Sequence, residues 1–316
     1  MLKAVGKFRK GRLPPTNNAM QTSTAELFVD CRCTLGEGIV WDTRRRALLW
    51  TDFENSTLWM HGSAGTRSWR TPDRLGSFAL CASGRVLLAL AKGLYLADLD
   101  DSAPGLVVHL LEPLETDLPR TRTNDGRTDR SGNFVFGTFN EAQDGAIGSF
   151  YQYSARRGLR RLDLGGVTIP NSICFSRDGR TMYFCDSPLG RIMRCDYDAG
   201  RARATNVREF VRLGATGGLP DGSIVDDEDC LWNAAWGAGR VRRYSPDGRV
   251  LQDIAIAAKN TTCPVFGGEA LMDLFVTSSR QEMSDEELAS VPQAGGVFRC
   301  ADVGVHGIAD ALVEGL

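Results

Sequence analysis

The sequence predicts an all-β protein, a six-bladed β-propeller with four-stranded antiparallel blades around a central channel. Three observations support this prediction: a repeated strand-and-turn unit, a spacing of about 40 to 50 residues between copies, and a scarcity of long helical patterns. Propellers build each blade from such a unit and arrange the blades around one axis. Ring closure also removes exposed sheet edges, which would otherwise invite aggregation.

Six copies of the repeat follow one another along the chain. Each begins with an apolar strand, continues through a turn rich in Asp and Gly, and adds two more strands with period-two alternation. The copies cover 38–61, 77–100, 126–154, 172–198, 222–248 and 265–300. Weaker fourth strands are visible at 159–164 and 249–256. The segment AELFVD (25–30) precedes the first copy, and we expect it to complete the last blade and close the ring.

Few segments lie outside the repeat. SDEELAS (284–290) is the one helical candidate, because Ser284 and Glu287 have the spacing of a capping box. It belongs to an insertion at 279–296, and a second irregular loop covers 141–149; we expect both on one face of the ring. The basic residues 1–20 are expected to be a flexible extension, with residues 21–316 forming a single propeller domain.

The composition is that of a globular protein with enough apolar residues to form a core. Hydrophobic residues make up 42% of the chain, charged residues 24%, and the net charge is −2. This balance does not steer the chain toward nucleic acid or an anionic membrane, and no apolar run reaches the roughly 18 residues of a membrane span. The nine cysteines contain no CxxC pair, which favours reduced thiols and a cytoplasmic location. The expected state is a monomer or a weak homodimer.

Familiar catalytic motifs are absent from the sequence. The three histidines, His61, His109 and His306, have no partner motif, which argues against a Ser-His-Asp site or a zinc centre. There is no G-x-S-x-G elbow, Walker loop or dinucleotide fingerprint either. Any chemistry must therefore come from carboxylates, amides and arginine.

Four polar side chains occupy the same phase of the repeat. Glu37, Asn124, Asn171 and Asp221 each stand five residues before the Asp or Ser that opens the next turn. Each of them alone could be an ordinary turn residue. If the repeats stack around one axis, however, equal phase means equal height, and the four side chains converge. Carboxylate and amide oxygens suit a hard cation such as Ca²⁺, Mg²⁺ or Mn²⁺, with open positions left for water or substrate.

Five segments occur in order along the chain: LGEGIVWD, RTNDGRTDRSGNFVFGT, IPNSICFSRDGRTMYFCDS, LPDGSIVDDEDCLWNAAWGAGRVRRYSPDG and CPVFGGEALMDLFVTS. Together they resemble the gluconolactonase/regucalcin (senescence marker protein) family over about residues 25–303. The resemblance implies a six-bladed propeller that hydrolyses sugar-acid lactones with one divalent metal ion in its axial channel. Ca²⁺ is the expected ion, with Zn²⁺, Mn²⁺ and Mg²⁺ as alternatives.

The resemblance also implies roles for individual residues. By motif position, Glu37, Asn171 and Asp221 are the implied metal ligands, and Asp221 is also the implied general base toward the attacking water. Arg122 and Asn124 are the implied contacts to the hydroxyls and carbonyl of the lactone.

One position departs from the family pattern. Relatives have a substrate-contacting Glu shortly after the FGT segment, where this chain has Ala142. The neighbouring Glu141 and Asn140 are therefore candidate substrate contacts, and the substrate preference is expected to differ from that of the best-known members.

The predicted function is metal-dependent hydrolysis of an aldono-1,4- or 1,5-lactone to the aldonic acid. Three alternatives stay open on the sequence: a propeller esterase or phosphotriesterase, a calcium-binding or buffering protein without turnover, and a scaffold that docks protein partners.

Overall fold

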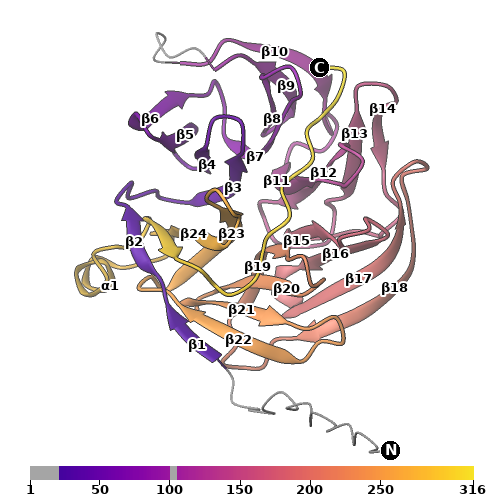
Figure 1. The fold of residues 1–316 in the computed structure, drawn as a ribbon. Helices are drawn as coiled ribbons and strands as arrows, with labels where there is room; N and C mark the ends of the chain where they lie inside the picture. The colour runs from indigo at the N-terminus through magenta and orange to yellow at the C-terminus, as the bar shows by residue number, and fades with distance from the viewer. Residues whose placement is uncertain (1–20, 100–104) are drawn as a thin grey trace, which may run out of the picture.

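The computed structural model describes residues 21–99 and 105–316, so the predicted extension at 1–20 lies outside the described residues. Six four-stranded antiparallel blades form a ring, which confirms the predicted propeller (Figure 1). The first three blades consist of β3 (Gly36–Asp42), β4 (Ala47–Asp52), β5 (Thr57–Gly62) and β6 (Gly65–Arg70); β7 (Leu75–Leu80), β8 (Val86–Leu90), β9 (Gly93–Ala97) and β10 (Val108–Pro113); and β11 (Thr121–Thr128), β12 (Phe134–Asn140), β13 (Phe150–Ser154) and β14 (Gly158–Arg161).

The other three blades continue in the same order. They consist of β15 (Pro170–Phe175), β16 (Thr181–Asp186), β17 (Arg191–Asp198) and β18 (Arg203–Arg212); β19 (Leu219–Val225), β20 (Leu231–Trp236), β21 (Arg240–Tyr244) and β22 (Val250–Ala255); and β23 (Asn260–Gly267), β24 (Asp273–Ser279), β25 (Val297–Cys300) and β2 (Glu26–Val29). A 3₁₀ turn, η1 (Ser187–Leu189), follows β16.

The ring closes as predicted, with one addition. β2 pairs antiparallel with β25, so the segment at 25–30 completes the sixth blade. Unexpectedly, β1 (Gln21–Thr24) pairs in parallel with β22 and gives the fifth blade a fifth strand. β1 and β2 thus attach the start of the described chain to two neighbouring blades.

The core lies between neighbouring blades. The strands near the axis are largely buried and mostly apolar. In β4 and β8, the second strands of the first two blades, every residue is buried. Separate apolar clusters fill the spaces between successive sheets, which is how sheets that pack face to face bury their surfaces. This packing fixes each blade relative to the axis and so fixes the height of the inner-strand side chains.

The insertion at 279–296 carries the predicted helix, α1 (Asp285–Ser290). The Ser284 side chain accepts a hydrogen bond from the Glu287 backbone N–H, and the Glu287 carboxylate accepts one from the Ser284 backbone N–H. This reciprocal capping confirms the capping box and satisfies two helix-terminal donors. No helix in the described residues is long and apolar enough to cross a bilayer.

The C-terminal segment crosses the ring at the far ends of the inner strands (Figure 1). Val313 bridges Cys81 just after β7, and Gly307 bridges Asp226 just after β19. Between them, Arg127 of β11 donates two hydrogen bonds to the Asp310 carboxylate, at 2.9 and 2.8 Å. The segment therefore ties three blades together at the end of the axis opposite to the cavity described next.

Candidate active site

The innermost strand of each blade is its first one in the sequence, apart from β1 and β2: β3, β7, β11, β15, β19 and β23. A cavity of about 300 Å³ opens where these inner strands begin. Five of the seven predicted site residues line it: Glu37 of β3, Arg122 and Asn124 of β11, Asn171 of β15 and Asp221 of β19. They come from four blades, and their sequence positions are far apart. The structure therefore brings together the side chains that share one phase of the repeat.

A β-bulge in each inner strand produces this convergence. In each of these four blades, the pairing between the first and second strands shifts register. The shift comes just after Glu37 and Asn171, and it spans the segments that contain Asn124 and Asp221. Bulges bend a strand and redirect its side chains, and they are frequent beside functional sites. Gly222 permits the tight approach that the bulge requires, because a Cβ there would lie 2.8 Å from the Cys263 sulfur.

The innermost strands β7 and β23 are bulged as well, but they carry hydroxyl groups at or next to the corresponding position. Ser77 of β7 donates to the carbonyl of Asn124 at 2.7 Å, and Thr262 of β23 donates to the carbonyl of Gly36 at 2.5 Å. Ser172 makes the same kind of link to the carbonyl of Asp221, at 2.6 Å. These hydroxyls satisfy backbone carbonyls of the innermost strand in the next blade, so they help to hold neighbouring blades together.

Two carboxyl groups line the cavity, that of Asp221, which is buried, and that of Glu37, which is partly buried. Burial and the neighbouring Glu37 and Asp125 raise the pKa of Asp221 well above its ordinary value. Burial and Asp125 likewise raise the pKa of Glu37 to about 8. The Oδ1 atom of Asp221 is buried and has no hydrogen-bond partner among the described residues. Such an arrangement disfavours the ionised carboxylates unless a cation compensates them.

The two amides are oriented by a chain of hydrogen bonds. Ser187 donates its hydroxyl to the Pro220 carbonyl at 2.7 Å, so it can only accept from the Asn171 Nδ2 atom at 2.9 Å. This turns Asn171 Oδ1 toward Asn124, whose Nδ2 atom donates to it at 2.9 Å and to the Pro170 carbonyl at 2.9 Å. Asn171 thus turns its oxygen toward Asn124 and its NH₂ group toward Ser187.

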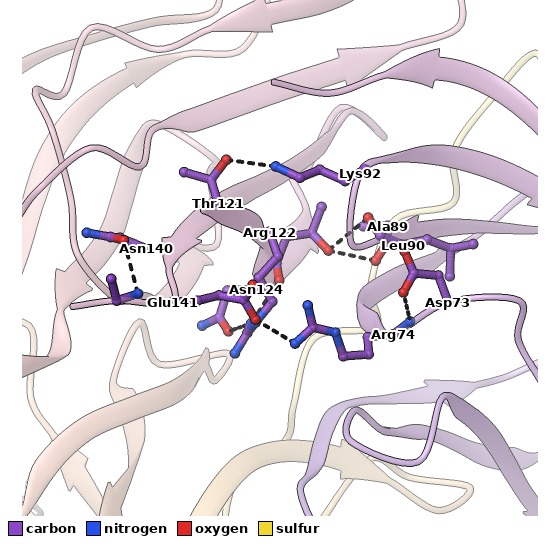
Figure 2. Close-up of polar contacts among 12 residues, drawn as sticks. Asp73, Arg74, Ala89, Leu90, Lys92, Thr121, Arg122, Asn124, Asn140 and Glu141 are labelled. Carbon is purple, nitrogen blue, oxygen red and sulfur yellow. Dashed lines mark hydrogen bonds and ion pairs between the residues drawn. The ribbon is translucent and has the colours of Figure 1, made fainter. Parts of the chain in front are cut away.

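Arg122 supplies the positive charge of the cavity wall. Its Nη1 atom donates to Asn124 Oδ1 at 2.6 Å and to the Thr123 carbonyl at 2.9 Å. Burial lowers the pKa of Arg122 to about 10, which leaves the guanidinium charged at neutral pH. Its Nε atom lies 3.7 Å from the Glu141 carboxylate, too far for a hydrogen bond (Figure 2).

The structure does not bring Asn140 or Glu141 into the cavity wall. Asn140 is fully buried, and its amide donates to Asp144 and to the Gly145 carbonyl, so it holds the turn after β12. Glu141 accepts a hydrogen bond from Arg74 at 2.5 Å (Figure 2). The loop at 141–149 instead contributes Gln143, whose φ of 52° is strained for a residue other than glycine.

Several residues of the site were missed by the sequence interpretation. Asp125 lies beside Asn124 in the RTNDG segment, and its partly buried carboxyl group helps to raise the pKa of both Glu37 and Asp221. In a regular strand, the neighbours Asn124 and Asp125 would point to opposite faces of the sheet. The bulge in β11 interrupts this alternation, so both side chains can act at the same site. Ile169 and Trp236 form an apolar side of the cavity, for which no motif gave a signal.

The donor set fits a hard divalent cation. Glu37 and Asp221 offer carboxylate oxygens, Asn171 offers an amide oxygen, and the Asp221 Oδ1 atom lacks a partner among the described residues. Within residues 21–99 and 105–316, no group of three or more His, Cys, Asp and Glu side chains could hold a metal ion. A cation here would therefore depend on the amide oxygen as well as on the carboxylates, which suits Ca²⁺, Mg²⁺ or Mn²⁺ better than Zn²⁺.

Comparison with known proteins shows that the chain is similar to proteins named as sugar lactonases. L-arabinolactonase of Azospirillum brasilense is 46% identical over 279 residues, covering 87% of this chain and 90% of that protein. The 6-deoxy-6-sulfogluconolactonase of Pseudomonas putida is 36% identical, with coverages of 89% and 95%. These relatives match along nearly the whole described ring.

A solved structure has the same architecture. The crystal structure of a calcium-binding protein, regucalcin, from Agrobacterium tumefaciens superposes with a TM-score of 0.86 at 32% identity, covering 93% of this chain and 99% of that one. Residues 35–280 also match the family described as SMP-30/Gluconolactonase/LRE-like region. Because this match covers more than half of the chain and includes the innermost strand of every blade, we conclude that the chain belongs to the SMP-30/gluconolactonase family.

Proposed function

We propose that the chain hydrolyses a sugar-acid lactone, an aldono-1,4- or 1,5-lactone, to the aldonic acid, with a bound divalent cation and with Asp221 as the general base. The observation that carries this proposal is the meeting of Glu37, Asn171 and Asp221 with Arg122 and Asn124 around one cavity. The names of the relatives, L-arabinolactonase and 6-deoxy-6-sulfogluconolactonase, support lactone hydrolysis as the reaction class.

The proposed cation ligands are Glu37, Asn171 and Asp221. We propose Ca²⁺ as the ion, since the donors are hard oxygens and the similar regucalcin structure is described as that of a calcium-binding protein. When bound, such an ion supplies Lewis-acid stabilisation of negative charge on the lactone oxygen. It would also satisfy the unpartnered Asp221 oxygen.

Asp221 is the proposed base. Its carboxylate takes one proton from a water molecule while the water oxygen forms a bond to the lactone carbonyl carbon. The ring C–O bond then breaks, and the leaving ring oxygen takes up the proton that Asp221 had accepted, which yields the open-chain aldonic acid and regenerates the carboxylate. A positioned general base typically contributes about 10²- to 10⁴-fold to the rate.

Arg122 and Asn124 are proposed to hold the lactone and its developing negative charge. Asn124 is held in place before substrate binds, because it accepts from Arg122 and donates to Asn171 and to the Pro170 carbonyl. Preorganised donors of this kind need little rearrangement during the reaction, and they usually give the largest single electrostatic contribution.

The walls of the cavity suit a single sugar ring. Arg122, Asn124 and Gln143 form a polar side that can bind hydroxyl groups, while Ile169 and Trp236 offer an apolar surface for the C–H face of the ring. A volume of about 300 Å³ is at the small end of the range for ligand pockets. These features favour a small hydroxylated lactone over a bulky aryl ester or phosphotriester.

A panel of aldonolactones tests the proposal. Acid release is measured by pH drop after chelation and after adding back Ca²⁺, Mg²⁺, Mn²⁺ or Zn²⁺, and is compared with spontaneous lactone opening in the same buffer. We expect metal-dependent turnover that is lost in Asp221→Asn with an unchanged circular dichroism spectrum. Tight metal binding without turnover of any lactone, ester or phosphotriester would instead support a calcium-binding role.

A further inference from the structure

Two phenylalanine rings enclose the guanidinium of Arg122. Its central carbon lies 3.9 Å from the centroid of the Phe53 ring and 4.1 Å from that of the Phe139 ring. Two rings cannot share one side of a single guanidinium at these distances, so they contact it from two sides. Phe53 follows β4 in the first blade and Phe139 lies in β12 of the third, so the contact also spans two blades.

The position of Phe53 is fixed independently of Arg122. Its ring is 2% exposed, its backbone N–H donates to the Leu35 carbonyl at 2.9 Å, and its own carbonyl accepts from Ser56. Leu35 belongs to the segment that leads into Glu37, and Asp52 accepts hydrogen bonds from the N–H groups of Thr34 and Leu35. Phe53 is not among the residues that line the cavity, whereas Phe139 is.

Hydrogen bonds alone do not fix the plane of this guanidinium. One nitrogen, Nη1, bonds to Asn124 and to the Thr123 carbonyl, while Nε is buried without a hydrogen-bond partner among the described residues. The Glu141 carboxylate lies 3.7 Å from Arg122 Nε, within ion-pair distance, but it accepts its hydrogen bond from Arg74 (Figure 2). Stacking on aromatic faces is specific to the planar guanidinium, and it is strongest where water is excluded.

We propose that Phe53 and Phe139 form an aromatic clamp that sets the plane of Arg122, so that its Nη2 group, which is not among the buried unpartnered atoms, faces the bound lactone. This inference rests on the proposed lactonase function. Phe53 acts as a positioning residue, through Arg122, because it does not line the cavity. Phe139 has two tasks, since it contacts Arg122 and also forms part of the cavity wall. The clamp further supports Asn124, whose orientation depends on the Arg122 hydrogen bond.

A double-mutant cycle tests the clamp. Phe53→Leu is expected to lower kcat/KM about ten-fold in the wild-type background, mainly through kcat, because the donor meets the charge that develops during reaction. In an Arg122→Lys background the same change is expected to have less than about a two-fold effect, since an ammonium group has no plane to hold. Equal losses in both backgrounds would show that Phe53 has only a structural role, and would overturn the proposal.

Matched variants separate clamping from core packing. Phe298→Leu removes an equally buried ring from β25 in the sixth blade, and it is expected to lower the melting temperature without changing kcat/KM. Phe139→Tyr keeps an aromatic ring at the partly exposed clamp position and is expected to retain most of the activity that Phe139→Leu loses. Loss of activity in Phe298→Leu equal to that in Phe53→Leu would contradict the clamp.

A spectroscopic measurement keeps the two proposals distinguishable. In ¹H–¹⁵N spectra of the arginine side chains, the Arg122 Nε–H signal, assigned by its loss in Arg122→Lys, should carry the ring-current shift of two stacked rings. Phe53→Leu is expected to reduce that shift, whereas Phe298→Leu is expected to leave it unchanged. An Arg122 signal without a ring-current shift overturns the clamp, while a shifted signal in a protein without lactone turnover overturns the proposed function alone.

Discussion

Asn124 donates a hydrogen bond from its Nδ2 atom to the Oδ1 atom of Asn171, at 2.9 Å, across the boundary between the third and fourth blades. The same Nδ2 atom also donates to the Pro170 carbonyl, and Asn124 Oδ1 accepts from Arg122. A continuous chain of hydrogen bonds therefore runs from Arg122, the proposed substrate contact, through Asn124 to Asn171, a proposed metal ligand. Both amides have one satisfactory orientation, and the substrate and metal parts of the site are physically linked.

The first prediction concerns this link. Asn124→Asp keeps the size of the side chain but replaces the NH₂ group with an oxygen that faces the Pro170 carbonyl and Asn171 Oδ1. We expect kcat/KM to fall by about 10²- to 10³-fold, the loss typical of removing one preorganised donor. Steady-state kinetics on the best aldonolactone provide the measurement. Activity within three-fold of wild type would show that the amide donor is not required.

The second prediction concerns the proposed base. Asp221→Asn should reduce kcat by about 10²-fold or more, because the amide cannot accept the proton of the attacking water. The folded protein should not lose stability without metal, because the change removes a buried carboxyl whose charged form is disfavoured by burial and by Glu37. Kinetics and thermal unfolding in chelator test both parts. Glu26→Gln, an exposed acid-to-amide change in β2, is the matched control.

The third prediction concerns the acidity of the metal-free site. Glu37 has a folded-state pKa of about 8, above the value of roughly 4.3 for an unfolded chain. A carboxyl whose pKa is raised by folding contributes stability below the unfolded pKa, and that contribution is lost as the pH rises toward the folded pKa. In chelator, the melting temperature should therefore decrease between pH 5 and pH 8.

Glu37→Gln provides the control for this pH dependence. The amide does not titrate, so the decrease in melting temperature should become smaller, although Asp221 and Asp125 still contribute to it. Adding Ca²⁺ to the wild-type protein should raise the melting temperature most at the upper end of this range, where fewer protons must be released. Identical pH profiles for the two proteins in chelator would contradict the prediction.

The architecture was largely predictable because its signals are local and repeated. Alternating apolar strands and Asp- or Gly-containing turns recur six times, and the pairing of β2 with β25 follows from the need to close the ring. β1 was not predictable in this way. Its sequence QTST has no apolar alternation, and it pairs in parallel with β22, a strand from a distant part of the sequence.

The site was only partly predictable for a related reason. Glu37, Asn171 and Asp221 could be brought together from their common phase alone, since a symmetric ring converts phase into height. Phe53 and Asp125 could not. Phe53 reaches Arg122 from the turn of another blade, and Asp125 faces the other acids through a bulge that interrupts strand alternation. Both depend on tertiary geometry that no single repeat encodes.

The last prediction concerns the far end of the axis. Arg127 and the Asp310 carboxylate form a pair in which both side chains are about nine-tenths buried, and the pair fastens the C-terminal segment across the ring. Asp310→Ala leaves the Arg127 charge buried without its partner, which should cost about 3 to 5 kcal/mol of unfolding free energy. Replacing both residues, as in Arg127→Met with Asp310→Leu, should cost less, because no uncompensated charge remains. Urea unfolding of the wild-type protein and of these two variants measures this difference, and kcat/KM of the folded fraction should stay near wild type because neither residue lines the cavity. A double variant that is as unstable as Asp310→Ala would show that packing of the C-terminal segment, rather than the ion pair, dominates at this position.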